Sequence, residues 1–141
     1  MASRSLDDLT DEMRELAVRH QELCLNAGFE LLIYCTLRSN DEQTALYAQG
    51  RTLPGNIVTN AKAGESAHNP DDNGKSNAYD CVPLSNGKPV WTNTNDNDIA
   101  LWNKVGTLGE SIGLSWAGRW TGKLHEMAHF QSGSWKINFP R

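Results

Sequence analysis

Three of the four histidines in this sequence are the residues best suited to chemistry, because they lie in polar segments rich in glycine. Functional side chains concentrate in segments of that kind. The three are His68, His125 and His129. His20 falls instead in an amphipathic stretch near the N-terminus, where we expect a surface or structural role rather than a functional one.

Residues 125–129 read His-Glu-Met-Ala-His, the pattern of a helical zinc site. On a helix the two histidines would share one face, and the glutamate between them would act as general base. Gly122 and Gly133 leave room for barely two helical turns. No histidine, aspartate, glutamate or cysteine follows residue 129, so any further ligand must come from upstream. A helical zinc site therefore stays as the alternative interpretation.

Two upstream segments supply candidate ligands, Ser-Ala-His at 66–68 and Ala-Tyr-Asp at 78–80. With these segments the chain resembles the LAS metallopeptidases that cleave peptidoglycan, the group of lysostaphin, the D-alanyl-D-alanine carboxypeptidases and the hedgehog fold. Within that group it is most similar to phage L-alanyl-D-glutamate endolysins. The resemblance covers most of the chain and rests on blocks in the same order, at 36–39, 42–43, 46–52, 55–61, 66–69, 113–120 and 129–131.

The resemblance implies one zinc ion held by His68, Asp80 and His129, with water in the fourth position. It implies that Glu126 is the acid/base carboxylate and that Arg38 steadies the substrate or the oxyanion. In this family the last segment is strand-like, so His125 would face away from the metal.

Four further residues are candidates for contact with substrate. The resemblance implies a supporting role for Ser66 beside the first ligand. Tyr47 and Trp116, together with Trp120, are candidates for the walls of the cleft, although aromatic residues more often belong to the core.

One spacing departs from the endolysin pattern, in which the aspartate ligand follows the histidine by seven positions. Here His68 and Asp80 are 80 − 68 = 12 positions apart, an insertion of five residues within 69–77. Asp71 and Asp72 therefore compete with Asp80 as ligands. We favour Asp80 because residues 78–82 reproduce the context of a ligand on a strand. The inserted residues could bind calcium through oxygen ligands, or form an ordinary solvated turn.

The helices and strands that must position these residues are predicted from the spacing of apolar residues and from helix-capping residues. The pattern predicts an α+β fold with a small antiparallel sheet, flanking helices and a single domain over residues 1–141. The expected elements are a helix over 6–24 that Gly28 ends, a strand over 29–37, a helix that Ser39 and Glu42 cap and Gly50 ends, a hairpin of 78–83 and 88–91 around Asn86-Gly87, and a helix from Asp96 or Asp98 to Gly113. The last segment should return to the sheet.

The composition and charge of the chain limit the kinds of partner that it could bind. The chain has 141 residues and a net charge of −4, without a basic cluster, which argues against nucleic acid. No apolar run predicts insertion into a membrane, and residues 1–11 do not resemble a signal peptide. We therefore expect synthesis in a bacterial host cytoplasm and release towards the cell wall through a holin. We also expect a monomer with three reduced cysteines.

The predicted function is zinc-dependent hydrolysis of the L-alanyl-D-glutamate bond of peptidoglycan, leading to host cell lysis. The alternatives are a D,D-carboxypeptidase of the same fold and an inactive wall-binding module. Retention of Glu126 argues against the inactive module, because a binding module needs no base.

Overall fold

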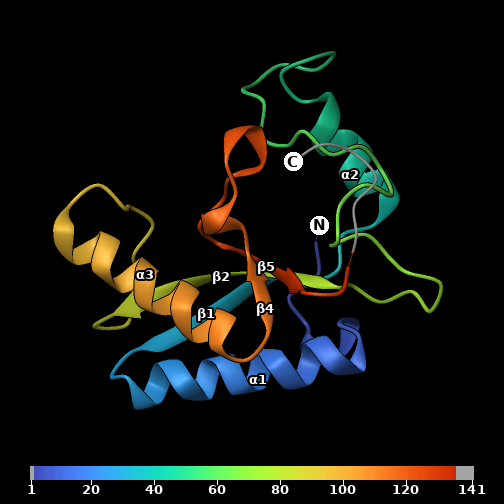
Figure 1. Ribbon diagram of the computed structural model, residues 1–141. Helices are drawn as coiled ribbons and strands as arrows, with labels where there is room; N and C mark the ends of the chain where they lie inside the picture. Colours follow the sequence, from blue (N-terminus) through green and yellow to red (C-terminus); the bar gives the residue numbers. More distant parts are fainter. Residues whose placement is uncertain (1, 136–141) are drawn as a thin grey trace.

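The computed structural model describes residues 2–135, which form one five-stranded antiparallel sheet with three α-helices (Figure 1). The strand order is β1-β2-β5-β4, with β3 paired to β2. The α+β prediction is therefore confirmed. The elements are α1 (Asp11–Asn26), β1 (Glu30–Cys35), α2 (Asn40–Ala48), β2 (Ala78–Ser85), β3 (Lys88–Pro89), α3 (Asp96–Ser111), β4 (Leu114–Trp116) and β5 (His129–Ser132). Short 3-10 helices span Leu6–Asp8, Ala117–Arg119 and Gly122–Leu124.

Helices α1 and α3 cover one face of the sheet and form the core with it. Met13, Ala17 and Cys24 project from α1 at helical spacing, and each is fully buried against side chains such as Phe130 of β5. Two glycines of α3 allow this helix to pack close to the sheet. A Cβ atom at Gly109, for example, would lie 2.7 Å from the Phe130 ring. The low helix propensity of glycine is thus offset by packing.

The predicted capping box at the start of α2 is confirmed. The Ser39 hydroxyl accepts a hydrogen bond from the Glu42 backbone N–H, and the Glu42 carboxylate accepts one from Ser39. Because the capping residue Ser39 directly follows Arg38, this cap also fixes the backbone position from which the Arg38 side chain extends.

The predicted cap of α3 is wrong. Neither Asp96 nor Asp98 caps the helix; the side chain of Asn95 accepts from the Asp98 N–H. Aspartate and asparagine are equally good caps, so composition alone does not choose among neighbouring candidates.

The hairpin between β2 and β3 turns at Asn86 and Gly87, as the sequence predicts. Both have positive φ, 52° and 77°, which is typical of a tight type I′ turn. The turn sets the register of β2 with β3. Farther along β2, Asp80 pairs with Cys35 of β1 and with His129 of β5, which places it in the middle of the sheet.

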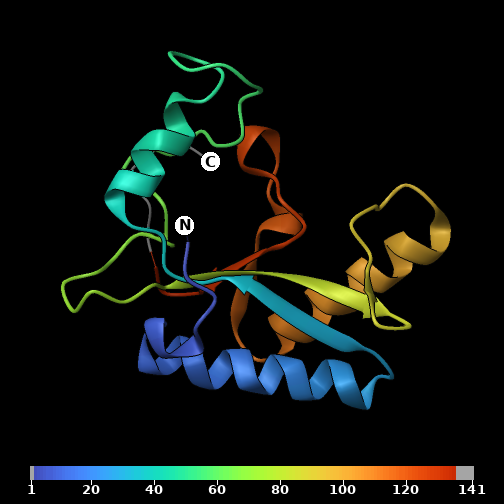
Figure 2. The same ribbon diagram turned by 180° about the vertical axis from the view of Figure 1, so that it is seen from behind.

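Two groups of elements stand on the face of the sheet opposite α1. Helix α2 and the segment after it stand on one side, and the segment 117–126 stands on the other (Figures 1 and 2). No helix within residues 2–135 combines the length and the apolar character that crossing a bilayer requires.

Candidate metal centre and active site

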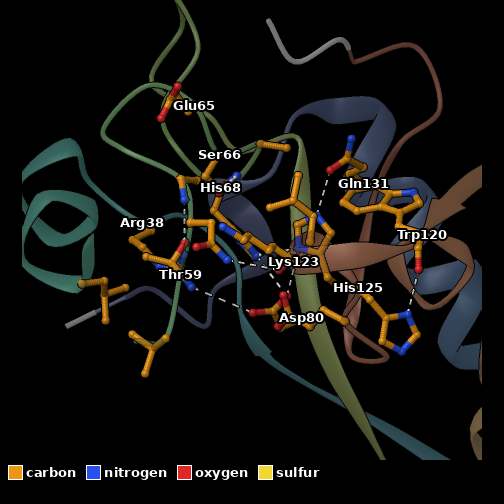
Figure 3. Close-up of a pocket in the computed structure, with 18 of the residues that line it drawn as sticks. Arg38, Thr59, Glu65, Ser66, His68, Asp80, Trp120, Lys123, His125 and Gln131 are labelled. Carbon is orange, nitrogen blue, oxygen red and sulfur yellow. Dashed lines mark hydrogen bonds and ion pairs between the residues drawn. The ribbon is translucent and has the colours of Figure 1, made fainter. Parts of the chain in front are cut away.

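A cleft of about 400 Å³ lies on the face of the sheet opposite α1 (Figure 3). The sheet forms its floor, residues 58–68 form one wall, and residues 120–126 form the other. The Asn60 side-chain amide donates to the Lys123 carbonyl at 3.2 Å and so joins the two walls. The cleft therefore has a fixed boundary on that side.

Three of the predicted site residues meet at its floor. The Nε2 atom of His68 lies 3.0 Å from Oδ1 of Asp80, and Nδ1 of His129 lies 3.2 Å from that same oxygen. The two histidine nitrogens are 3.2 Å apart. Asp80 pairs with His129 across β2 and β5, whereas His68 comes from the loop before β2. The fold thus brings Asp80 and His129, which follow His68 by 12 and 61 positions in the sequence, into one triangle with it.

The triangle has the dimensions of a metal site. Ligand atoms on a tetrahedral zinc, about 2.0–2.1 Å from the metal, are separated by about 3.3 Å. The three edges here are 3.0, 3.2 and 3.2 Å. The donor set of two imidazoles and one carboxylate also suits zinc and neighbouring divalent ions.

In each of the two histidines, the far ring nitrogen, the one outside the triangle, has a hydrogen-bond partner of its own. Nδ1 of His68 lies 2.7 Å from the Thr36 carbonyl, and Nε2 of His129 lies 2.8 Å from Oε1 of Gln131. Both partners are acceptors, so each far nitrogen carries a proton, and in the neutral ring the nitrogen in the triangle then has a lone pair for a metal. This arrangement is the one that metal ligation requires.

Cys35 belongs to a second possible ligand group, with His68 and Asp80. Its sulfur is 3.9 Å from Nδ1 of His68, the nitrogen that faces away from the triangle. Because that nitrogen already donates to Thr36, the group with His129 fits a metal better.

Burial alone would raise the pKa of the Asp80 carboxyl, but the charges and hydrogen bonds of His68 and His129 hold it well below its usual range. Burial likewise opposes a charge on His68. The Asp80 carboxylate outweighs that effect and raises the pKa of His68 to about 10. Without a metal, the pair is therefore a buried ion pair at neutral pH.

Glu126 lies above the triangle, with a carboxylate oxygen within 4.8 Å of the ligand atoms of Asp80 and His129. The residue is exposed at the mouth of the cleft, yet the cleft walls desolvate its carboxylate. That desolvation, and then the negative charge of Asp80, raise the pKa of Glu126. A raised pKa makes a carboxylate a better proton acceptor, as a general acid and base requires.

Arg38 reaches the same site from the segment between β1 and α2. Its Nη2 lies 3.9 Å from Oδ2 of Asp80, and its Nη1 donates to Oε1 of Gln43 at 3.0 Å. Gln43 is itself fully buried and donates to the Ala61 carbonyl. The guanidinium is thus held in one position at the edge of the cleft.

Ser66 lines the cleft, and its hydroxyl accepts a hydrogen bond from the His68 backbone N–H at 3.2 Å. Tyr47 does not line this cleft. Its ring packs against the Arg51 guanidinium, 3.8 Å from the ring centre. A role for Tyr47 in substrate binding stays a prediction.

The prediction that Trp116 contacts substrate is wrong. Trp116 is 2% exposed, stacks with Phe130 in the core, and donates its indole N–H to the Met127 carbonyl. Trp120 is the tryptophan that lines the cleft. A strand alternates faces, and sequence alone could not say on which face Trp116 lies.

The helical interpretation of residues 125–129 is also wrong. His125 ends a 3-10 helix, a turn follows, and His129 begins β5. The His125 ring turns to the Trp120 carbonyl, 2.9 Å away (Figure 3). His125 therefore lines the rim of the cleft without joining the triangle. The strand-like expectation holds only from His129 onwards.

The inserted residues form a turn that projects away from the site (Figure 1). Oδ1 of Asp71 accepts from the backbone N–H groups of Asn73 and Lys75, so its own loop engages this oxygen. Neither Asp71 nor Asp72 lines the cleft, whereas Asp80 does.

Sequence reasoning gave no role to Gln131, whose carbonyl oxygen supports His129. The signal was present, because residues two apart on a strand share a face. Nothing in the sequence pointed to the Thr36 carbonyl, since a backbone partner depends on the fold and not on the residue type.

Comparisons with known proteins agree with this picture. No protein-family model matches the chain. The chain is 33% identical over 117 residues to the peptidoglycan L-alanyl-D-glutamate endopeptidase CwlK of Bacillus subtilis, covering 80% of this chain and 67% of that protein. Its fold matches the crystal structure of the L-Ala D-Glu endopeptidase ChiX of Serratia marcescens with a TM-score of 0.62 at 18% identity, covering 94% of this chain and 88% of that one.

Proposed function

Because this chain belongs to the family of peptidoglycan L-alanyl-D-glutamate endopeptidases, we propose that it hydrolyses the bond between L-alanine and D-glutamate in peptidoglycan. The observation that carries the proposal is the meeting of His68, Asp80 and His129 beneath Glu126 in one open cleft. That arrangement pairs a metal triangle with a carboxylate able to move protons.

We propose that His68, Asp80 and His129 hold one zinc ion. Their edges fit tetrahedral ligation, and the outer nitrogen of each imidazole faces an acceptor, so that each neutral ring can present a lone pair to the metal. Zinc in such a site supplies Lewis acidity, which activates water and polarises a peptide carbonyl. Chelation should abolish activity and added zinc should restore it; full activity of protein shown by elemental analysis to be metal-free would sink the zinc proposal.

Glu126 is the proposed acid/base residue. Its carboxylate takes the proton of the attacking water and then gives a proton to the departing amine of D-glutamate. Arg38 is the proposed electrostatic partner, because a planar guanidinium at the edge of the cleft can grip a substrate carboxylate or the developing oxyanion. Ser66 keeps the first ligand's loop in place through the His68 N–H.

The bond specificity has a direct test. Purified peptidoglycan is digested, and the products are analysed by mass spectrometry. The proposal expects new N-terminal D-glutamate on the released peptides and no new reducing sugar ends. Release of free D-alanine alone would favour a D,D-carboxypeptidase, and binding to the wall without any release would favour an inactive module.

The biological role we propose is lysis of a bacterial host, with the protein acting as a monomeric single domain over residues 1–141. In this proposal it accumulates in the host cytoplasm and reaches the cell wall when a holin opens the membrane. Expression in bacteria with and without a holin tests this, because lysis should require both proteins.

The turn at Asp71 and Asp72 remains a proposed calcium site. Its support is the oxygen-rich composition of the turn, since Asp72 is exposed and available. Titration of calcium into the zinc-loaded enzyme should change its rate, and a flat titration leaves the turn as a spacer.

A further inference from the structure

Gln131 is an unusual residue for the centre of a sheet. It is 2% exposed and lies on β5 between Ala78 of β2 and Ser115 of β4. A polar side chain buried there is costly unless its atoms are hydrogen-bonded. Gln131 follows His129 by two positions, so the two side chains share the face that carries the metal triangle.

Only one end of its amide is satisfied. Oε1 of Gln131 accepts from Nε2 of His129 at 2.8 Å. Its amide nitrogen is buried and has no hydrogen-bond partner among residues 2–135. The side chain therefore keeps its contact with the histidine although one donor is left without a partner, which is expected of a residue selected for that contact.

The orientation of the amide and the proton of the ring are coupled. If the amide were flipped, its N–H would need a lone pair on Nε2 of His129. The ring proton would then sit on Nδ1, the atom that lies 3.2 Å from both Asp80 and His68. A protonated Nδ1 cannot bind a metal.

We propose that Gln131 is a positioning residue that holds His129 in the tautomer and ring orientation that present Nδ1 to the metal. The inference rests on the proposed zinc site. The other histidine gets the equivalent support from a backbone carbonyl, that of Thr36, which no side-chain substitution removes. Of these two supporting hydrogen bonds, only the one between Gln131 and His129 can therefore be removed by a side-chain substitution that leaves the metal ligands in place.

The first test compares the zinc affinities of two variants by competition with a chromophoric chelator. Gln131→Met keeps the size of the side chain but offers no comparable acceptor, and zinc affinity should fall about 10- to 100-fold. Gln131→Glu restores the acceptor with a stronger one, and its zinc affinity should equal or exceed that of the wild type. Wild-type affinity in Gln131→Met, or an equal loss in both variants, would overturn the inference.

Ser132→Ala is the matched control. Ser132 is the next residue on β5, is equally buried at 2%, and donates to Glu12 on the opposite face of the strand. Its loss removes a buried hydrogen bond from the same strand without touching His129. It should keep the zinc affinity of the wild type; a loss as large as that of Gln131→Met would assign the effect to strand stability and overturn the inference.

A second measurement needs no variant. Nitrogen NMR of isotope-labelled histidine in the zinc-loaded wild type should show the His129 proton on Nε2 and the metal on Nδ1. A proton on Nδ1 would overturn the inference even if Gln131→Met did not fold. If the wild type bound no zinc, the proposed metal site would fail along with it. Zinc binding with the opposite tautomer would leave the proposed function standing and remove only the role of Gln131.

Discussion

Both faces of the sheet bury histidine side chains, and His20 on one face behaves in the opposite way to His68 on the other. His20 is 0% exposed beneath the sheet, and His68 is 2% exposed above it. Their partners are consecutive residues of β2: the Tyr79 hydroxyl is 2.7 Å from His20, and the Asp80 carboxylate is 3.0 Å from His68. Alternation along one strand thus gives one histidine a neutral partner and the other a charged partner.

The difference appears in their pKa values. Desolvation lowers the pKa of His20 to about 4, since Tyr79 and the Val105 carbonyl bring no compensating charge. The carboxylate of Asp80 raises the pKa of His68 to about 10 in spite of equal burial. Burial alone therefore does not mark a functional histidine. The charge of the partner does.

The largest expected effect separates the two histidines directly. His68→Ala removes a vertex of the triangle, so the protein should lose zinc and fall to the activity of zinc-depleted protein. His20→Gln should reduce stability but keep one zinc per chain and near-normal activity. Equilibrium dialysis with zinc and peptide release from peptidoglycan measure both; a zinc-replete, active His68→Ala variant would show that the site is misassigned.

The next effect concerns Glu126, the proposed proton-transfer residue. Glu126→Gln keeps the shape of the side chain but cannot accept a proton, and kcat should fall about 10²- to 10⁴-fold with zinc retained. His125→Ala is its neighbour and control: it lies outside the triangle, so it should keep zinc and lose less activity. Loss of zinc from His125→Ala would show that His125 does bind the metal and that the proposed ligand set is wrong.

The third prediction concerns the stability of the zinc-free protein against pH. His20 has a folded pKa of about 4 and an unfolded pKa of 6.5, so its contribution is complete above pH 6.5 and is lost as the pH falls towards 4. The loss should amount to about 3 kcal/mol. His68 acts in the other direction: its contribution is complete below pH 6.5 and is lost as the pH rises towards about 10.

Urea unfolding across this pH range should therefore give greatest stability near pH 6.5, with a decline on each side. The acid decline should be smaller in His20→Gln, and excess zinc should remove the alkaline decline. An acid decline that is unchanged in His20→Gln would mean that other groups cause it.

The smallest expected effect is that zinc binding releases a proton, which makes the zinc affinity depend on pH. Since the His68 pKa of about 10 leaves the ring protonated at neutral pH, zinc must displace one proton. Apparent zinc affinity should rise about tenfold per pH unit through the neutral range. Calorimetry in buffers of different ionisation enthalpy should find one proton released per zinc at pH 7. Release of none would mean that His68 is neutral before zinc binds.

The sequence by itself determined the residue types of the site and the local structure around it. The capping box at Ser39 and Glu42 and the turn at Asn86-Gly87 are local features, formed between residues at most three apart. The order of the motif blocks was enough to name His68, Asp80, His129, Glu126 and Arg38, and these residues do meet in one cleft.

Only the tertiary structure decided which side of the sheet each of those residues faces. It placed Trp116 in the core, put Asp80 rather than Asp72 beside the histidines, and gave His20 and His68 different partners. It also supplied the acceptors that fix the ring protons, Gln131 on β5 and the Thr36 carbonyl. The physical reason is that hydrogen bonds and ion pairs act over about 3 Å, and only the tertiary fold, through strand pairing and the packing of helices and loops on the sheet, brings residues distant in the chain to that separation.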